Sequence, residues 1–212
     1  MKRNKQYRQA ALAAVLMLGA GLCHAADMVT EARYSGMGPG SRLDLSQAGA
    51  YNSAIVDQSG GSRLSQTQDG DRNKSNVLQQ GGAQATLLQS GSGNEANVAQ
   101  RGASQQLALT QSGSYNAAFV SQSGNGNQAG IDQVGLGNNL SFTQTGTSNQ
   151  ASLAQVGSYN QANVVQSGAY NQAFVTQYGD NNKATVTQGT GAYGTLSITQ
   201  TGNDMTASAT QQ

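Results

Sequence analysis

The sequence has few aromatic and few charged residues. Aromatic residues make up 5% of its 212 positions, charged residues make up 10%, and tryptophan is absent. These proportions are too low to build an ordinary globular core, so they exclude a conventional globular domain. The 28 glycines and the mean hydropathy of −0.48 would by themselves indicate disorder, but a strict internal repeat argues against that interpretation.

Cysteine and histidine each occur once, as Cys23 and His24, at the end of a distinct N-terminal segment. This segment has four basic residues in its first eight positions, an apolar run from Ala10 to Leu22, and the small residue Ala25. The pattern predicts a secretory signal peptide over residues 1–25. The apolar run has 13 residues, fewer than the roughly 20 that a transmembrane anchor needs. A lipoprotein with an acylated Cys23 is a weaker alternative, because the bulky Leu22 precedes the cysteine.

Cleavage after Ala25 would leave a chain with neither cysteine nor histidine. Disulfides, Ser-His-Asp and Cys-His catalytic sites and the usual zinc sites are then excluded. The chain would keep 7 of its 11 basic residues and all 10 acidic ones, which gives a net charge of 7 − 10 = −3 and argues against a nucleic-acid-binding surface. We therefore expect no enzyme activity, no cofactor and no metal site. Asp69, Asp71 and Asp180 are interpreted as solvated charges beside turn glycines.

Residues 26–46 lack the repeat that fills the remainder of the chain. They contain the only proline, Pro39, within the run S-G-M-G-P-G-S from Ser35 to Ser41. This composition predicts a flexible leader. The alternative is a strand that caps the first repeat.

Residues 47–212 form an almost unbroken tandem array of the unit Q-x-G-x-x-N-x-A-x-x-x-Q, which is clearest from Gln155 to Gln177. The glutamines that open the units define 15 intervals, of which twelve are 11 residues, two are 10 and one is 12. Glycine follows the glutamine by two positions in nearly every unit, and asparagine follows it by five positions in ten units. We expect glycine to supply a positive φ and asparagine a left-handed backbone, so that each unit is a strand followed by a tight turn.

Inward and outward residues alternate before each closing glutamine. Ala162 and Val164 fall on the same side as Gln166, and this alternation predicts a β-strand. The position two before the closing glutamine is large and apolar in thirteen of fifteen units, so it is the predicted core row. The core residues that we single out are Val56, Val98, Val120, Ile131, Phe142, Leu153, Val164, Val175, Val186 and Ile198. The inward amides that we expect to form ladders and to mediate assembly are Gln47, Gln58, Asn94, Gln100, Gln111, Asn116, Gln122, Gln133, Gln144, Gln155, Asn160, Gln166, Asn171, Gln177, Gln188, Gln200 and Gln211.

A single 11-residue unit cannot bury its apolar row alone, but two units folded against each other can. The sequence therefore predicts an all-β fold, a two-sided β-solenoid with 22 residues per rung, in which 15 strands make seven to eight rungs. Glutamines and asparagines in register would form amide ladders from rung to rung, as in cross-β amyloid. The pattern runs on to Gln211 and no capping element is evident, so we expect both ends of the stack to be open and the product to be a fibre.

The repeat unit resembles the curlin repeat, and the resemblance covers roughly Leu45 to Gln212 together with the signal peptide and the short leader. It implies a secreted structural subunit of curli, the extracellular functional amyloid fibre of biofilm matrix and surface adhesion. It also implies that the protein belongs on the surface of a Gram-negative-type bacterium and assembles with itself and with a partner curlin subunit. Export would pass through a dedicated outer-membrane secretion pore with the help of accessory factors. By the same analogy, residues 26–46 would be the secretion-targeting segment.

The curlin family has a major fibre subunit and a minor, surface-attached nucleator that seeds it. Asparagine at successive units from Asn116 to Asn182 and irregular units at residues 79–82 and 188–194 favour the nucleator. The major subunit stays an alternative, because the chain has more repeats than is usual for either. A monomeric β-solenoid adhesin and a passive matrix binder are further alternatives, and neither would self-assemble.

Overall fold

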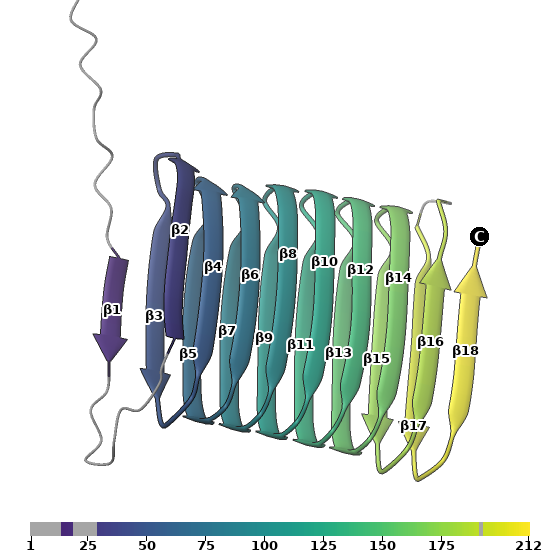
Figure 1. The fold of residues 1–212 in the computed structure, drawn as a ribbon. Helices are drawn as coiled ribbons and strands as arrows, with labels where there is room; N and C mark the ends of the chain where they lie inside the picture. Colours follow the sequence, from purple (N-terminus) through teal and green to yellow (C-terminus); the bar gives the residue numbers. More distant parts are fainter. Residues whose placement is uncertain (1–13, 19–28, 191–192) are drawn as a thin grey trace, which may run out of the picture.

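The computed structural model describes residues 14–18, 29–190 and 193–212, and every regular element in these ranges is a β-strand. The strands form two nine-stranded sheets, one behind the other, with all neighbouring strands parallel (Figure 1). The chain moves from one sheet to the other at every turn, so consecutive strands lie in different sheets. This architecture confirms the all-β, two-sided solenoid predicted from the sequence.

The odd-numbered strands form one layer, here called the odd sheet. They are β1 (Ala14–Leu18), β3 (Arg42–Ala48), β5 (Arg63–Asp71), β7 (Gln84–Ser92), β9 (Gln106–Ser114), β11 (Gln128–Leu136), β13 (Gln150–Ser158), β15 (Gln172–Tyr178) and β17 (Thr195–Thr201). The even-numbered strands form the other layer, the even sheet. They are β2 (Val29–Met37), β4 (Ser53–Gly60), β6 (Lys74–Gly81), β8 (Glu95–Ala103), β10 (Ala117–Asn125), β12 (Asn139–Thr147), β14 (Gln161–Ala169), β16 (Lys183–Gln188) and β18 (Thr206–Gln211).

One rung consists of an odd strand and the even strand that follows it, from β3 with β4 to β17 with β18. Strands of neighbouring rungs pair with like residues opposite each other, such as Gln122 with Gln144 and Gly124 with Gly146. These partners are 22 residues apart, as predicted. The register is specified strongly because a slip of one residue would turn every apolar side chain toward solvent.

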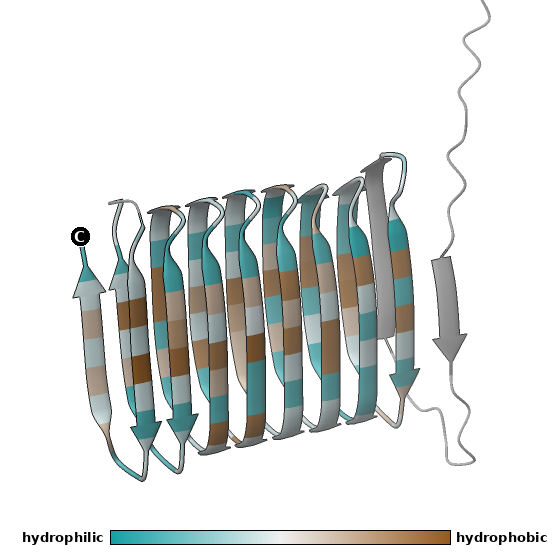
Figure 2. Cartoon of the chain, turned by 180° about the vertical axis from the view of Figure 1, so that it is seen from behind, coloured by the Kyte–Doolittle hydropathy of each residue, from teal (hydrophilic) through white to brown (hydrophobic). Residues whose placement is uncertain are grey.

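Alternation within each strand separates a buried face from a wet face. In β14, Ala162, Val164 and Gln166 are buried, whereas Gln161 and Asn163 are exposed. Figure 2 shows the same alternation as hydrophobic and hydrophilic bands that cross the strands of neighbouring rungs at the same height. The inward apolar side chains form one continuous cluster along the stack between the two sheets.

Each corner between strands depends on the glycine of the repeat. At Gly135 φ is +121°, and a Cβ atom there would collide with the carbonyl oxygen of Gly157 on the next rung. The second left-handed residue of the corner is the one before the asparagine, as at Tyr115 with φ of 57°, and not Asn116. The prediction that asparagine supplies the left-handed backbone is therefore wrong. The asparagine side chain points inward instead, where its amide forms hydrogen bonds with the neighbouring rungs.

Residues 26–46, for which composition predicted a flexible leader, contain β2 and most of β3. β2 pairs with β4 and β3 pairs with β5, so the stack begins before Gln47. Leu43 and Leu45 of β3 belong to the buried core.

The predicted signal peptide, residues 1–25, lies outside the described residues except for Ala14–Leu18. That short segment is β1, which pairs with β3. Within the part of the chain that the structure describes, no helix has the length and apolar character to cross a membrane.

Candidate functional site: amide ladders and strand edges

Two unbroken ladders of glutamine side chains run through the interior, one along each sheet. In every step the Nε2 atom of one glutamine donates to the Oε1 atom of the glutamine one rung closer to the C-terminus. In the odd sheet the seven steps measure 2.7–2.9 Å and join Gln47, Gln68, Gln89, Gln111, Gln133, Gln155, Gln177 and Gln200. In the even sheet six steps measure 2.7–2.9 Å and the last 3.4 Å, and they join Gln58, Gln79, Gln100, Gln122, Gln144, Gln166, Gln188 and Gln211.

The second hydrogen of most of these amides ties the two sheets together. Gln144 of the even sheet donates from Nε2 to the main-chain oxygen of Gln128 in the odd sheet at 3.0 Å. Gln133 of the odd sheet donates in the same way to Ala117 of the even sheet at 3.0 Å. A ladder glutamine therefore fixes both the spacing of the rungs and the distance between the sheets.

These amides are hidden from solvent, since every ladder glutamine except Gln211 is at most 4% exposed. A buried amide without partners costs about 1–3 kcal/mol, and the two ladders contain sixteen glutamines. Burial is tolerable only when rungs stack in register, so the ladders make folding and stacking one event.

Asparagines form a further ladder at the corner that follows each odd strand. It joins Asn52, Asn73, Asn94, Asn116, Asn138, Asn160 and Asn182. Here the donors point the other way: the main-chain nitrogen and Nδ2 of Asn138 both donate to Oδ1 of Asn116, at 3.1 and 3.0 Å. Asn138 Nδ2 also lies 3.1 Å from the oxygen of Val134 in its own turn and 2.9 Å from that of Gly157 on the next rung.

The corner that follows each even strand has a shorter asparagine ladder. It contains Asn127, Asn149 and Asn171, with the main-chain nitrogen of each later residue donating to Oδ1 of the one before at 3.0 Å. On the three preceding rungs the same buried position holds Ser62, Ala83 and Gln105. The amide ladder is therefore complete along one corner of the solenoid and begins only at Asn127 along the other.

Three buried side-chain oxygens among the described residues have no hydrogen-bond partner: Oε1 of Gln58, of Gln66 and of Gln105. Gln105 fills an asparagine position with a longer side chain. Gln66 replaces the apolar core residue of its unit, and its Nε2 donates to the Ser75 hydroxyl. Gln58 begins the ladder of the even sheet.

All ten core residues singled out from the sequence lie between the sheets and are at most 7% exposed. The amides singled out from the sequence belong to the ladders described above, with Asn171 in the shorter corner ladder and Gln211 half-buried at the last rung. Sequence reasoning left Gln68, Gln79 and Gln89 out of the site, although their 11- or 10-residue spacing carried the signal. It placed the row four before the closing glutamine on the inward side but singled out none of its members as core residues, although Leu64, Leu107 and Leu140 of that row are buried.

The last rung exposes strand edges and part of the core. β17 and β18 end their sheets, and no described residue pairs with their outer edges. Leu196, Ala207 and Ala209, which continue the inward rows, are only partly buried there. Unpaired backbone groups beside apolar side chains are the features that allow a strand of another chain to add.

The described residues hold no group of three or more side chains of the kinds that ligate metals. What the arrangement provides is a repeating set of hydrogen-bond donors, acceptors and apolar rows in parallel register. These features define a parallel β-solenoid with the in-register amide ladders of a cross-β assembly.

A family model described as the Curlin associated repeat matches residues 106–135 and 160–191. These two matched segments support membership of the curlin family. Comparison with curated proteins gives no significant match. The curlin repeats indicate a curli fibre subunit, and both the family and the solenoid fold are structural in character. Membership implies self-assembly into curli fibres outside the cell.

Proposed function

We propose that this chain is a fibre subunit that extends by adding further copies to the ends of its solenoid. The observation that carries the proposal is the pair of glutamine ladders, which run in one direction through every rung from β3 to β18. A ladder of this kind has a donor end and an acceptor end, and a second copy in the same orientation presents the complementary group. Curlin family membership supports the proposal.

The finer role that we propose is nucleation, in which the folded stack templates a partner curlin. The run of asparagine from Asn116 to Asn182 and the irregular units at residues 79–82 and 188–194 support it. The alternative is the major fibre subunit, which the unbroken glutamine ladders favour, because a bulk subunit gains most from identical rungs.

Export, and placement on the surface of a Gram-negative-type bacterium, belong to the same proposal. The signal-peptide pattern of residues 1–25 supports export. Passage through an outer-membrane secretion pore, a targeting role for residues 26–46, and a part in biofilm matrix and adhesion are taken from the family.

Self-assembly is tested by incubating the chain without residues 1–25 and following thioflavin fluorescence, with diffraction from aligned fibres. We expect fibres with a repeat of about 4.8 Å along the axis and about 10 Å across it. A chain that stays dispersed at high concentration would instead support the monomeric adhesin or the passive matrix binder.

Nucleation is tested by adding substoichiometric preformed seeds of this chain to a partner curlin. We expect a shorter lag than with an equal mass of unassembled chain. An unchanged lag for the partner, together with efficient seeding of the chain itself, would favour the major subunit.

A further inference from the structure

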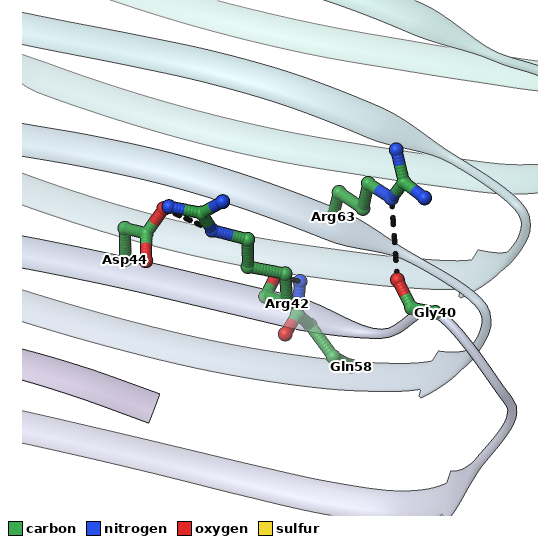
Figure 3. Close-up of polar contacts among 5 residues, drawn as sticks. All are labelled: Gly40, Arg42, Asp44, Gln58 and Arg63. Carbon is green, nitrogen blue, oxygen red and sulfur yellow. Dashed lines mark hydrogen bonds and ion pairs between the residues drawn. The ribbon is translucent and has the colours of Figure 1, made fainter. Parts of the chain in front are cut away.

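The ladder of the even sheet starts with an acceptor that lacks a donor. Gln58 is 1% exposed, and its Oε1 has no hydrogen-bond partner among the described residues. Its Nε2 donates to Gln79 in the ladder and also lies 3.4 Å from the main-chain oxygen of Arg42. Figure 3 shows the Gln58 side chain next to Arg42. Every later glutamine of this ladder accepts a hydrogen bond from the rung before. At Gln58 the register partner on β2 is Tyr34, whereas every later position of this ladder pairs glutamine with glutamine.

The two sheets have unequal numbers of strands once the predicted signal peptide is removed. Cleavage after Ala25 takes away β1, which leaves eight strands in the odd sheet (β3 to β17) and nine in the even sheet (β2 to β18). Copies that stack end to end in register need the same number in both sheets. β2 is the surplus strand, and keeping it would leave a gap of one strand between β17 of one copy and β3 of the next.

The connection from β2 to the stack suits a strand that can leave. The pairing of β2 with β4 shifts register between Tyr34 and Met37. The next residues are Gly38, Pro39 and Gly40, and φ at Gly40 is +87°. A glycine-rich segment lets β2 swing away while β3 keeps its pairing with β5.

We propose that β2 is a detachable cover for the edge of β4, and that β18 of a second copy replaces it when the fibre grows. β18 has the residues that this edge requires, since its pairing with β16 sets Ala207, Ala209 and Gln211 opposite Ala184, Val186 and Gln188. The same register on β4 sets Gln211 opposite Gln58, and Gln211 Nε2 then supplies the missing donor. In the odd sheet, the same stacking sets Gln200 of β17 opposite Gln47 of β3 in the next copy.

This inference rests on the proposed function, and disulfide trapping in fibres tests it. With β2 displaced, Ser208 of one copy lies opposite Ile55 of the next. With β2 in place, Ser208 lies opposite Glu31, the register partner of Ile55. Neighbouring strands are about 4.8 Å apart, within the roughly 4.4–6.8 Å between Cα atoms that a disulfide spans. The chain after Ala25 has no cysteine, so the pairs Ile55→Cys/Ser208→Cys and Glu31→Cys/Ser208→Cys report only on these contacts.

Fibres of each double variant are oxidised, dissolved and separated without reductant, and the same chains oxidised before assembly serve as the control. We expect a ladder of covalent oligomers from Ile55→Cys/Ser208→Cys and at least tenfold less from Glu31→Cys/Ser208→Cys. If the first pair does not assemble, the Ile55→Cys and Ser208→Cys single variants are co-assembled, and covalent dimers are expected.

The reverse preference, or fibres in which neither pair forms oligomers, would overturn the displacement of β2 and leave self-assembly standing. An absence of fibres from the unmodified chain would instead refute the proposed function, and this inference with it.

Discussion

A buried carboxamide is stable in this fold because an identical group lies one rung away. Gln122 illustrates the arrangement: it accepts from Gln100 at 2.8 Å, donates to Gln144 at 2.8 Å, and donates to the main chain of Gln106 at 3.2 Å. The places where this pattern fails are therefore the residues at which stability can be gained. Away from the first rung of the ladder, these are Gln105 and Gln66.

Gln105→Asn is expected to stabilise the stack. An asparagine there would extend the corner ladder, because its Oδ1 can accept from the main-chain nitrogen of Asn127 as Asn127 itself accepts from Asn149 at 3.0 Å. Removing the unpartnered oxygen should raise stability by about 1 kcal/mol. The measurement is the guanidinium concentration that dissolves half of the assembled chain. The matched control is Gln106→Asn on the exposed face, and an equal shift from both variants would contradict the account.

Gln66→Leu combined with Ser75→Ala is also expected to be stabilising. Gln66 and Ser75 are hydrogen-bonded to each other, but Gln66 Oε1 has no partner. The double substitution replaces both residues with the types that other rungs have at these positions, leucine and alanine. A gain of about 1–3 kcal/mol follows from removing the buried polar groups together. Gln66→Leu alone should gain less, because it leaves the Ser75 hydroxyl without its donor. Dissolution midpoints of the single and double variants decide the point, and a double variant less stable than the parent chain would count against it.

At the scale of the element, each strand-and-corner unit depends on a glycine that the next rung approaches closely. Gly135→Ala should disrupt stacking by roughly 1–3 kcal/mol from backbone strain alone, and the collision with the Gly157 carbonyl adds to this. Gly130→Ala in the same strand is the control, since a Cβ atom there meets nothing within 4 Å. Assembly lag times of the two variants should differ clearly, and similar lags would mean that the corner is misplaced.

The inward face of a strand is tested by charge. Val164→Asp places an unpaired carboxylate at a fully buried position and should stop assembly, with a loss of more than about 3 kcal/mol. Ser152→Asp lies on the exposed face of β13 and should be mild. The yield of sedimentable fibre measures both effects. Equal yields from the two variants would mean that the inward face is assigned wrongly.

The sequence predicted the strands and their faces because period-2 alternation and the glutamine spacing both survive in nearly every unit. It misassigned the corner because asparagine suits either a left-handed backbone or a hydrogen-bonded ladder, and only the structure shows that Tyr115 takes the first role and Asn116 the second. It placed the start of the stack too late, although Leu43, Leu45 and Gln47 already alternate. In that segment the usual glutamine and glycine do not precede the strand, so the repeat unit is not recognisable there.

At the scale of the whole molecule, one chain supplies eight successive rungs, β3 with β4 through β17 with β18. An assembly built from such chains differs from an amyloid in which each chain contributes a single layer. With a rise of about 4.8 Å per rung, end-to-end extension adds one chain for every 38 Å or so of fibre. An assembly of single layers would add one chain for every 4.8 Å.

The mass per unit length of single, unbundled filaments, measured by scanning transmission electron microscopy, tests the central claim most directly. The account predicts about one chain per 38 Å of filament, from eight rungs at about 4.8 Å each. A value near one chain per 4.8 Å, or a chain that forms no filament at all, would contradict it.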